Sequence, residues 1–105
     1  NMLIVTTDSI ADRKIVKVLG LVKGSTVRSK NIGKDIGAGL KGIVGGELNA
    51  YTEMLTESRQ IAIGRMVEEA ESMGANAIVA LRLQSAAVMQ GAAEMVAYGT
   101  AVVIE

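Results

Sequence analysis

The longest regular pattern in the chain is helical and covers ELNAYTEMLTESRQIAIGRMVEEAESM, from Glu47 to Met73. Apolar residues recur in it at spacings of three and four, or sums of these, which places them on one face of a helix. This face consists of Leu48, Tyr51, Leu55, Ala62, Met66, Ala70 and Met73. The apolar region is widened by Met54, Ile61, Ile63 and Val67. We therefore expect a second surface, such as a neighbouring subunit, to contact the helix in addition to a sheet.

Two β-like segments precede the helix. Met2–Thr7 (MLIVTT) is short, and a turn follows it at Asp8–Asp12. Lys14–Lys30 is rich in Val and Ile, but its apolar residues do not keep one parity. Gly20 and Gly24 are the natural places for a bulge or bend that switches the parity. We expect one long bent strand or two short strands here.

Two further strands follow the helix. Gly74 is placed to cap the C-terminus of the helix. Asn76–Val88 and Ala93–Ile104 read as strands, and Gln90-Gly91 supplies a tight hairpin turn between them. The predicted order is β–β–α–β–β, with the last two strands antiparallel. We expect one α+β domain over residues 1–105, a two-layer fold in which the helix packs on an antiparallel sheet.

The composition predicts a thin core and self-association. Half of the 105 residues are hydrophobic, but Tyr51 and Tyr98 are the only aromatic residues. Small side chains bury little apolar area each, at roughly 25 cal/mol per Å². A short chain with such a core gains stability by burying surface against copies of itself. We therefore expect a homo-oligomer.

Several partners and chemistries are excluded by what the sequence lacks. Eleven Lys and Arg balance eleven Asp and Glu, so no basic excess suggests a nucleic-acid partner. The absence of Cys and His removes the usual zinc and copper ligands and the usual general base near neutral pH. No apolar run approaches the length of a membrane span, and the N-terminus does not resemble a signal peptide. We expect no membrane association and a cytoplasmic location.

The glycine-rich stretch Asn31–Gly46 (NIGKDIGAGLKGIVGG) is the most distinctive candidate site. Glycines before a helix can aim backbone N–H groups at a phosphate or carboxylate, and Lys34 and Lys41 could add charge. However, the stretch matches neither the P-loop nor the dinucleotide fingerprint. Alternatively, Ile32, Ile36, Leu40 and Ile43/Val44 form one face of a short helix whose glycines allow close packing. The sequence favours a packing element, with a ligand site within Gly33–Gly46 or a flexible lid as alternatives.

Other candidate groups have simpler interpretations. Glu53 with Glu57, and Glu68 with Glu71, could hold a hard cation, but they lie on the polar side of the helix and read as a solvated stripe. Arg59 projects into the apolar arc, where we expect a structural ion pair. The six Met residues read as core and interface filler. The hydroxyls of Thr6, Thr7, Ser9, Ser25 and Ser29 have no His to activate them.

Four motifs carry a resemblance to a known family. They are NIG-x-DIGAGL at 31–40, GGEL-x-x-YTE at 45–53, GANA-[IV]-V at 74–79 and AYGTAV at 97–102. With the segments around them, these motifs closely resemble the YbjQ-like family over nearly the whole chain. The resemblance implies a dodecin-like α+β subunit, ring-like homopentamers and a heavy-metal-binding label. It supplies no catalytic residues to carry over.

These observations predict a cytoplasmic, homo-oligomeric protein whose partner is itself and whose biochemical activity the sequence does not specify. They favour a non-enzyme over an enzyme. We expect no catalytic residues and no cofactor. We also expect no metal ligands, because carboxylates, carbonyls and thioethers are a poor donor set for soft metals. A first alternative is a module that binds a small ligand or metal ion at subunit interfaces near Gly33–Gly46. A second is an enzyme with an inter-subunit site made from Lys, Arg, Glu and Tyr98.

Overall fold

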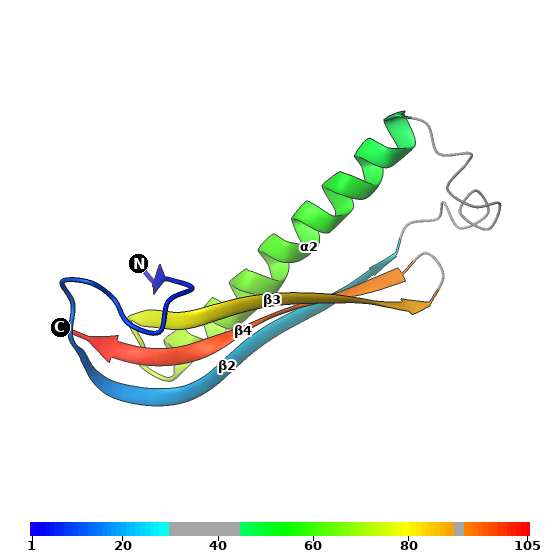
Figure 1. Cartoon of the computed structure of the whole chain (residues 1–105). Helices are drawn as coiled ribbons and strands as arrows, with labels where there is room; N and C mark the ends of the chain where they lie inside the picture. Colours follow the sequence, from blue (N-terminus) through cyan, green and yellow to red (C-terminus); the bar gives the residue numbers. More distant parts are fainter. Residues whose placement is uncertain (30–44, 90–91) are drawn as a thin grey trace.

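The computed structural model describes residues 1–29, 45–89 and 92–105 and has the predicted order of elements (Figure 1). These are β1 (Leu3–Ile4), β2 (Ile15–Ser29), α2 (Gly45–Ser72), β3 (Ala77–Met89) and β4 (Ala92–Ile104). Helix α2 packs on one face of a four-stranded sheet of order β1-β3-β4-β2. The predicted α+β class is confirmed. The geometry of the predicted Gln90-Gly91 turn lies outside the described residues.

The sheet is mixed, which corrects the expectation of a purely antiparallel sheet. The central strand β4 pairs antiparallel with both β2 and β3, whereas β1 pairs parallel with β3. Strand β1 is also shorter than the predicted Met2–Thr7. The chain continues beside β3 through single hydrogen bonds, with the Val5 N–H donating to the Ile78 carbonyl at 2.9 Å. A parallel pair needs a long crossover, and here β2 and the helix supply it.

Strand β2 is one long strand with two irregularities. Its register against β4 shifts between Ile15 and Lys17 and again between Val18 and Gly20. Gly20 has a backbone φ of 128°, which residues with a side chain rarely adopt. Together with the register shift beside it, this value confirms the predicted bulge at Gly20. The predicted bend at Gly24 is wrong. Gly24 pairs in regular register with Ala97, and its missing side chain instead lets α2 lie against the strand.

The C-terminus of the helix has the predicted glycine cap. Gly74 has a φ of 87°, and its N–H donates to the Glu71 carbonyl at 3.0 Å. The Ala75 N–H donates to the Ala70 carbonyl at 3.1 Å. These two hydrogen bonds make a Schellman motif, which satisfies carbonyls that the helix itself cannot.

The buried face of α2 differs in part from the predicted face. It is a row at spacings of four: Met54, Ser58, Ala62, Met66 and Ala70. Positions four apart drift by about 40° per step around a helix, so the row is oblique and the helix crosses the sheet diagonally (Figure 1). Tyr51 and Leu55, predicted for this face, are half-buried, and Met73 is exposed. The side chain of Leu48 lies outside the described residues.

The core has two parts, one on each face of the sheet. On the helix face, α2 packs against Val22, Ile78, Met95, Ala97 and Ala101. On the opposite face, Val5, Ile10 and Ile15 cover Ala77, Val79, Val102 and Ile104. The side chain of Asn76 fixes the last strand by donating to the Ile104 carbonyl at 2.9 Å and accepting from its N–H at 2.7 Å. We call this doubly covered end, where both termini lie in Figure 1, the proximal end.

The molecule is elongated. Its Cα radius of gyration is 17.1 Å, whereas a compact chain of this length has about 13 Å. The extents are 53 × 22 × 19 Å, and the sheet runs well beyond its doubly covered end (Figure 1). Within the described residues, no helix is long and apolar enough to cross a membrane.

Candidate functional site

The part of the sheet away from the termini is the most unusual feature of the molecule. It consists of Lys23–Ser29 of β2, Arg82–Met89 of β3 and Ala92–Tyr98 of β4, which pair in one antiparallel sheet. We call this region the distal sheet; it lies at the right of the sheet in Figure 1. Strand β3 changes character where this region begins. Ala77, Ile78 and Val79 are buried, whereas every residue from Arg82 to Met89 is exposed.

The change coincides with the end of the N-terminal cover on β3. The Ala80 N–H donates to the Thr7 carbonyl at 2.9 Å, and the Leu81 N–H donates to the Val5 carbonyl at 3.1 Å. Ala80 has a φ of 57°, and the register against β4 shifts between Val79 and Arg82. This bulge turns the strand away from the N-terminal segment. Beyond it, the side of β3 remote from β4 has no backbone partner within the described residues.

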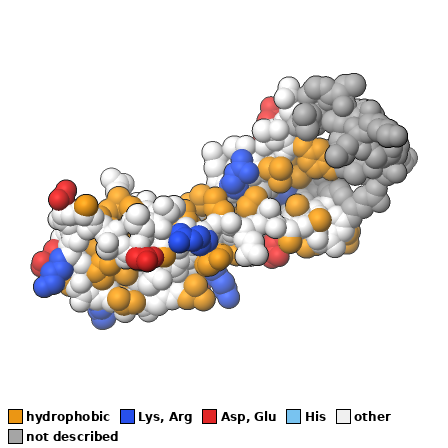
Figure 2. All heavy atoms as spheres, in the orientation of Figure 1, with side chains coloured by type: hydrophobic (Ala, Val, Ile, Leu, Met, Phe, Trp, Pro, Cys, Tyr) orange, Lys and Arg blue, Asp and Glu red, His pale blue; other side chains and the backbone are white. Residues whose placement is uncertain are grey.

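Large apolar side chains of the distal sheet are exposed. Leu83 is 43% exposed, Val88 50% and Met89 69%, all on β3. On β2, Val27 is 58% exposed. Hydrophobic side chains reach the surface along the face seen in Figure 2. Scattered apolar residues are normal on a protein surface. Several of them on a strand that is paired along one edge only indicate an interaction surface.

The other edge of the sheet is protected. On β2, the N–H of Lys23 donates to a carboxylate oxygen of Glu69 at 2.8 Å, and the carbonyl of Ser25 accepts from the Arg65 guanidinium at 2.6 Å. Both partners project from α2, which runs along this strand. Helix side chains therefore bind backbone groups that another strand would need.

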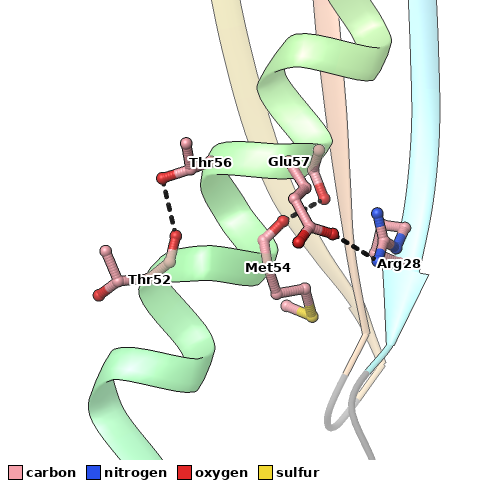
Figure 3. A network of polar contacts seen from close by, with 6 residues as sticks. Arg28, Thr52, Met54, Thr56 and Glu57 are labelled. Carbon is pink, nitrogen blue, oxygen red and sulfur yellow. Dashed lines mark hydrogen bonds and ion pairs between the residues drawn. The ribbon is translucent and has the colours of Figure 1, made fainter.

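An ion pair also links α2 to β2 in the distal region. Arg28 Nη2 and Glu57 Oε2 are 3.2 Å apart; the Glu57 side chain is exposed and that of Arg28 is partly exposed. Figure 3 shows this pair bridging the strand and the helix; on the side of the helix away from the strand, the Thr56 hydroxyl donates to the Thr52 carbonyl at 2.8 Å. The buried Ser58 hydroxyl donates to the Met54 carbonyl at 2.8 Å. An exposed pair contributes about 0–1 kcal/mol, so it orients the helix more than it stabilises it.

A shallow hollow lies on the distal sheet. It has a volume of about 240 Å³ and is lined by Gln84, Ser85, Ala86, Glu94 and Val96. Small-molecule sites usually enclose about 300–1,000 Å³ and bury most of their ligand. This hollow is smaller and open, so its geometry does not indicate a ligand pocket.

Tyr98, a candidate of the enzyme alternative, sits in a row of polar residues. It pairs in register with Lys23 on one side and Arg82 on the other, and directly opposed residues share a sheet face. Arg82 Nη1 donates to the Thr6 and Leu81 carbonyls at 2.9 and 2.8 Å. The row offers hydrogen-bond donors, but it supplies neither a nucleophile with an adjacent base nor a carboxylate pair. It shows no catalytic arrangement.

The other predicted candidates are not brought together into a site. Glu53, Glu57, Glu68 and Glu71 are exposed, as expected for a solvated stripe. Arg59 is half-buried, and its Nη2 donates a hydrogen bond to the Thr56 hydroxyl oxygen at 3.2 Å. Its predicted ion pair across an interface stays a prediction. The stretch Asn31–Val44, including Lys34 and Lys41, lies outside the described residues. Gly45 and Gly46 form the start of α2.

The sequence does not predict the exposed surface of the distal sheet. The sequence predicts a strand at Asn76–Val88, but it does not predict that the second half of this strand is uncovered. One signal was present: Leu83–Met89 (LQSAAVM) carries no charge and no proline over seven residues. Exposed edge strands usually contain such residues, so their absence points to a covered edge.

Comparison with known proteins gives consistent similarities over the whole chain. Residues 2–105 match the YbjQ family model, described as "Putative heavy-metal-binding". The chain is 71% identical to a UPF0145 protein of Clostridioides difficile (strain 630), covering 99% of this chain and 93% of that one. It is 56% identical to a UPF0145 protein of Methanosarcina acetivorans, covering 98% and 97%.

A solved structure shares the fold. It is the crystal structure of a protein of unknown function of the DUF74 family from Pediococcus pentosaceus, with a TM-score of 0.64 and 18% sequence identity. The match covers 99% of this chain and 98% of that one. At this identity the similarity concerns the fold alone.

Proposed function

The chain belongs to the YbjQ family, the group of the UPF0145 proteins, and from that premise we propose that it is a non-enzymatic, cytoplasmic subunit of a homo-oligomer. The assembly is a ring, with five subunits as the resemblance implies. The role that we propose for each subunit is association with copies of itself. Any ligand then binds to the assembly rather than to one subunit.

One observation carries this proposal: among the residues that the structure describes, the distal half of β3 is exposed on both faces and has no partner along one edge. All residues from Arg82 to Met89 are exposed, including three large apolar side chains. In a monomer, such a strand would be a site of aggregation. The radius of gyration of 17.1 Å supports the same reading, because the chain does not close over its own sheet.

The thin core adds a second reason for assembly. The fully buried residues of the helix-face cluster include Ala62, Ala70, Ala97 and Ala101. Alanine contributes little buried area, and each Å² of apolar surface contributes roughly 25 cal/mol. Covering the distal sheet with another copy adds apolar burial that the single chain lacks.

Light scattering coupled to size-exclusion chromatography tests the proposal. The chain has a mass of 10.9 kDa, and we expect a stable multiple of that mass at micromolar concentration. Serial dilution should leave the mass unchanged until the assembly dissociates. A 10.9 kDa species at every concentration would overturn the proposal.

The family is described as heavy-metal-binding, and tight binding of such metals usually needs thiolate or imidazole ligands. The side chains of this chain do not provide them. The sequence contains neither Cys nor His. Within the described residues, no three Asp or Glu gather in a group that could hold a metal ion. Thioethers and single carboxylates bind Zn²⁺ and Cu²⁺ weakly, because these ions prefer thiolate and imidazole ligands.

We expect calorimetric titration with Zn²⁺ and Cu²⁺ to give no saturable binding to the purified assembly. The control is a chain with both Glu53→His and Glu57→His, which places two imidazoles one turn apart on the exposed side of α2. This variant should bind Zn²⁺ under the same conditions. Saturable binding to the unmodified chain would instead favour the alternative, an ion or small-ligand site between subunits near Gly33–Gly46.

A further inference from the structure

The bulge in β3 determines the face of the sheet on which Arg82 lies. Val79 pairs with Thr100 and Arg82 pairs with Tyr98, so three steps along β3 match two steps along β4. Val79 lies on the face opposite α2, and regular alternation from there would place Arg82 on the helix face. The extra residue moves Arg82 to the face of Tyr98 instead. Ala80 takes up the bulge with a φ of 57°, which is uncommon for a residue with a side chain and is often found at functional sites.

The guanidinium group of Arg82 is oriented by backbone carbonyls and not by a carboxylate. Its Nη1 donates to the Thr6 and Leu81 carbonyls at 2.9 and 2.8 Å. Its Nε and Nη2 have no hydrogen-bond partner among the described residues. These two nitrogens form the side of a guanidinium group that donates two parallel hydrogen bonds to an oxyanion. Arg82 is therefore held with this side free.

Tyr98 and Lys23 continue the row of donors across the sheet. Tyr98 pairs with Arg82 on one side and with Lys23 on the other. Neighbouring strands are about 4.8 Å apart, so the three Cα atoms span about 10 Å. Within residues 1–29, 45–89 and 92–105, neither the Tyr98 hydroxyl nor the Lys23 ammonium group has a polar partner. The row thus combines two cations with one hydroxyl donor.

The acidic residues near the row do not neutralise it. Glu94 lies on the same face of β4, four residues from Tyr98, which corresponds to about 13 Å along a strand. This separation exceeds the screening length of about 8 Å at physiological ionic strength. The carboxylate of Glu69 accepts from the Lys23 N–H, but it projects from α2, which packs on the other face. The row therefore keeps its positive charge.

We propose that Arg82, Tyr98 and Lys23 bind a phosphate group, either as free phosphate or as a phosphate monoester. The free side of Arg82 binds two oxygens, the Tyr98 hydroxyl donates to a third, and Lys23 supplies the second positive charge. A phosphate group carries about 1.5 to 2 negative charges at neutral pH, which two cations balance better than they balance a carboxylate. All three residues belong to one chain, so the site does not depend on the proposed self-assembly. A copy that covers the distal sheet would enclose the bound group.

The two tyrosines give a local readout of binding, because the chain has no Trp. In a Tyr51→Phe chain, Tyr98 is the only fluorophore, and in a Tyr98→Phe chain the only fluorophore is Tyr51 on α2. Both are titrated with sodium phosphate and, separately, with glycerol 3-phosphate at constant pH and ionic strength. We expect the emission of Tyr98 to change saturably, whereas that of Tyr51 changes only linearly by collisional quenching. Saturation by one of the two compounds alone identifies the source of the phosphate group.

Charge variants in the Tyr51→Phe background identify the residues that bind. Arg82→Gln should raise the half-saturating phosphate concentration about tenfold, because it removes a bidentate charged donor. Lys23→Gln should raise it about threefold, because Lys23 acts as a point charge. Lys17→Gln, which removes an exposed charge from the same strand outside the row, is the control and should have no effect. Circular dichroism checks that each variant is folded.

Three results would overturn the inference. They are a Tyr98 emission that saturates with neither phosphate compound, an unchanged titration curve in both Arg82→Gln and Lys23→Gln, and half-saturation by sodium acetate at the same concentration as by phosphate. Light scattering on the same samples tests the proposed assembly separately. An oligomer without phosphate binding would leave the proposed function standing, whereas a monomer that binds phosphate would remove the proposed function alone.

Discussion

Replacing Gly24 by alanine should destabilise the fold by about 3 kcal/mol, at the upper end of the usual overpacking cost. A Cβ on Gly24 would collide with the carbonyl oxygen of Ala62 and the amide nitrogen of Met66, and would lie 2.8 Å from the Cβ of Arg65. Two of these atoms belong to the helix backbone, so no side-chain rotation relieves the overlap. Either α2 moves away from β2 or the strand shifts against β4.

Gly64→Ala is the matched control, because it adds the same methyl group at an exposed position of α2, outside the contact with β2. Nothing lies within 4 Å of a Cβ at Gly64, in the middle of α2. Alanine should therefore stabilise the helix there by about 1 kcal/mol. Urea unfolding followed by circular dichroism, at one protein concentration for all variants, measures both effects. If Gly24→Ala unfolds at the same urea concentration as the wild type, α2 does not lie against β2 as described.

Met66→Ala should remove about 3 kcal/mol, because it truncates the large helix residue at the centre of the core. Met66 is 0% exposed and belongs to the cluster with Val22, Ile78 and Ala97. Four of the other buried members of this cluster are alanines, namely Ala62, Ala70, Ala97 and Ala101, and such short side chains can close little of the cavity. The loss therefore includes both the transfer term and the cavity term.

The control for this prediction is Met73→Ala, the same substitution one position beyond the end of α2. Met73 is 37% exposed, so we expect a loss of less than about 1 kcal/mol. Thermal and urea unfolding of both variants give the comparison. Equal losses for Met66 and Met73 would contradict the position of the core, since only one of the two side chains is enclosed.

The parts of the fold that local chemistry determines were predictable from the sequence. Periodicity located α2, and the predicted bulge at Gly20 and the cap at Gly74 both occur, with φ values of 128° and 87°. These features depend on a few neighbouring residues. The same glycine argument was wrong at Gly24, where the reason for glycine is the approach of a helix that is distant in sequence.

Long-range contacts explain what the sequence did not reveal. The parallel pairing of β1 with β3 joins residues more than seventy positions apart, such as Leu3 and Ala77. The burial of Ser58 depends on the angle at which α2 crosses the sheet, and its hydroxyl is satisfied within the helix by Met54. No local pattern encodes either contact.

The candidate site in the structure, the distal sheet, differs from the candidate site that the sequence predicts. The glycine stretch 33–46 is the most distinctive segment of the sequence, and its role in packing or binding stays a prediction. The structure instead shows an open edge at Arg82–Met89 and a protected edge at Lys23 and Ser25. Exposure of a strand depends on which elements cover it, and the sequence of the strand alone does not specify them.

The most direct test of the account is the number of subunits, counted by native mass spectrometry of the unmodified chain. The proposed ring predicts a multiple of the 10.9 kDa subunit mass, with five subunits as the family resemblance implies. Another multiple of the subunit mass would keep the proposed self-assembly but contradict the number of five subunits. A mass of 10.9 kDa alone would contradict the central claim that the distal sheet is covered by another copy.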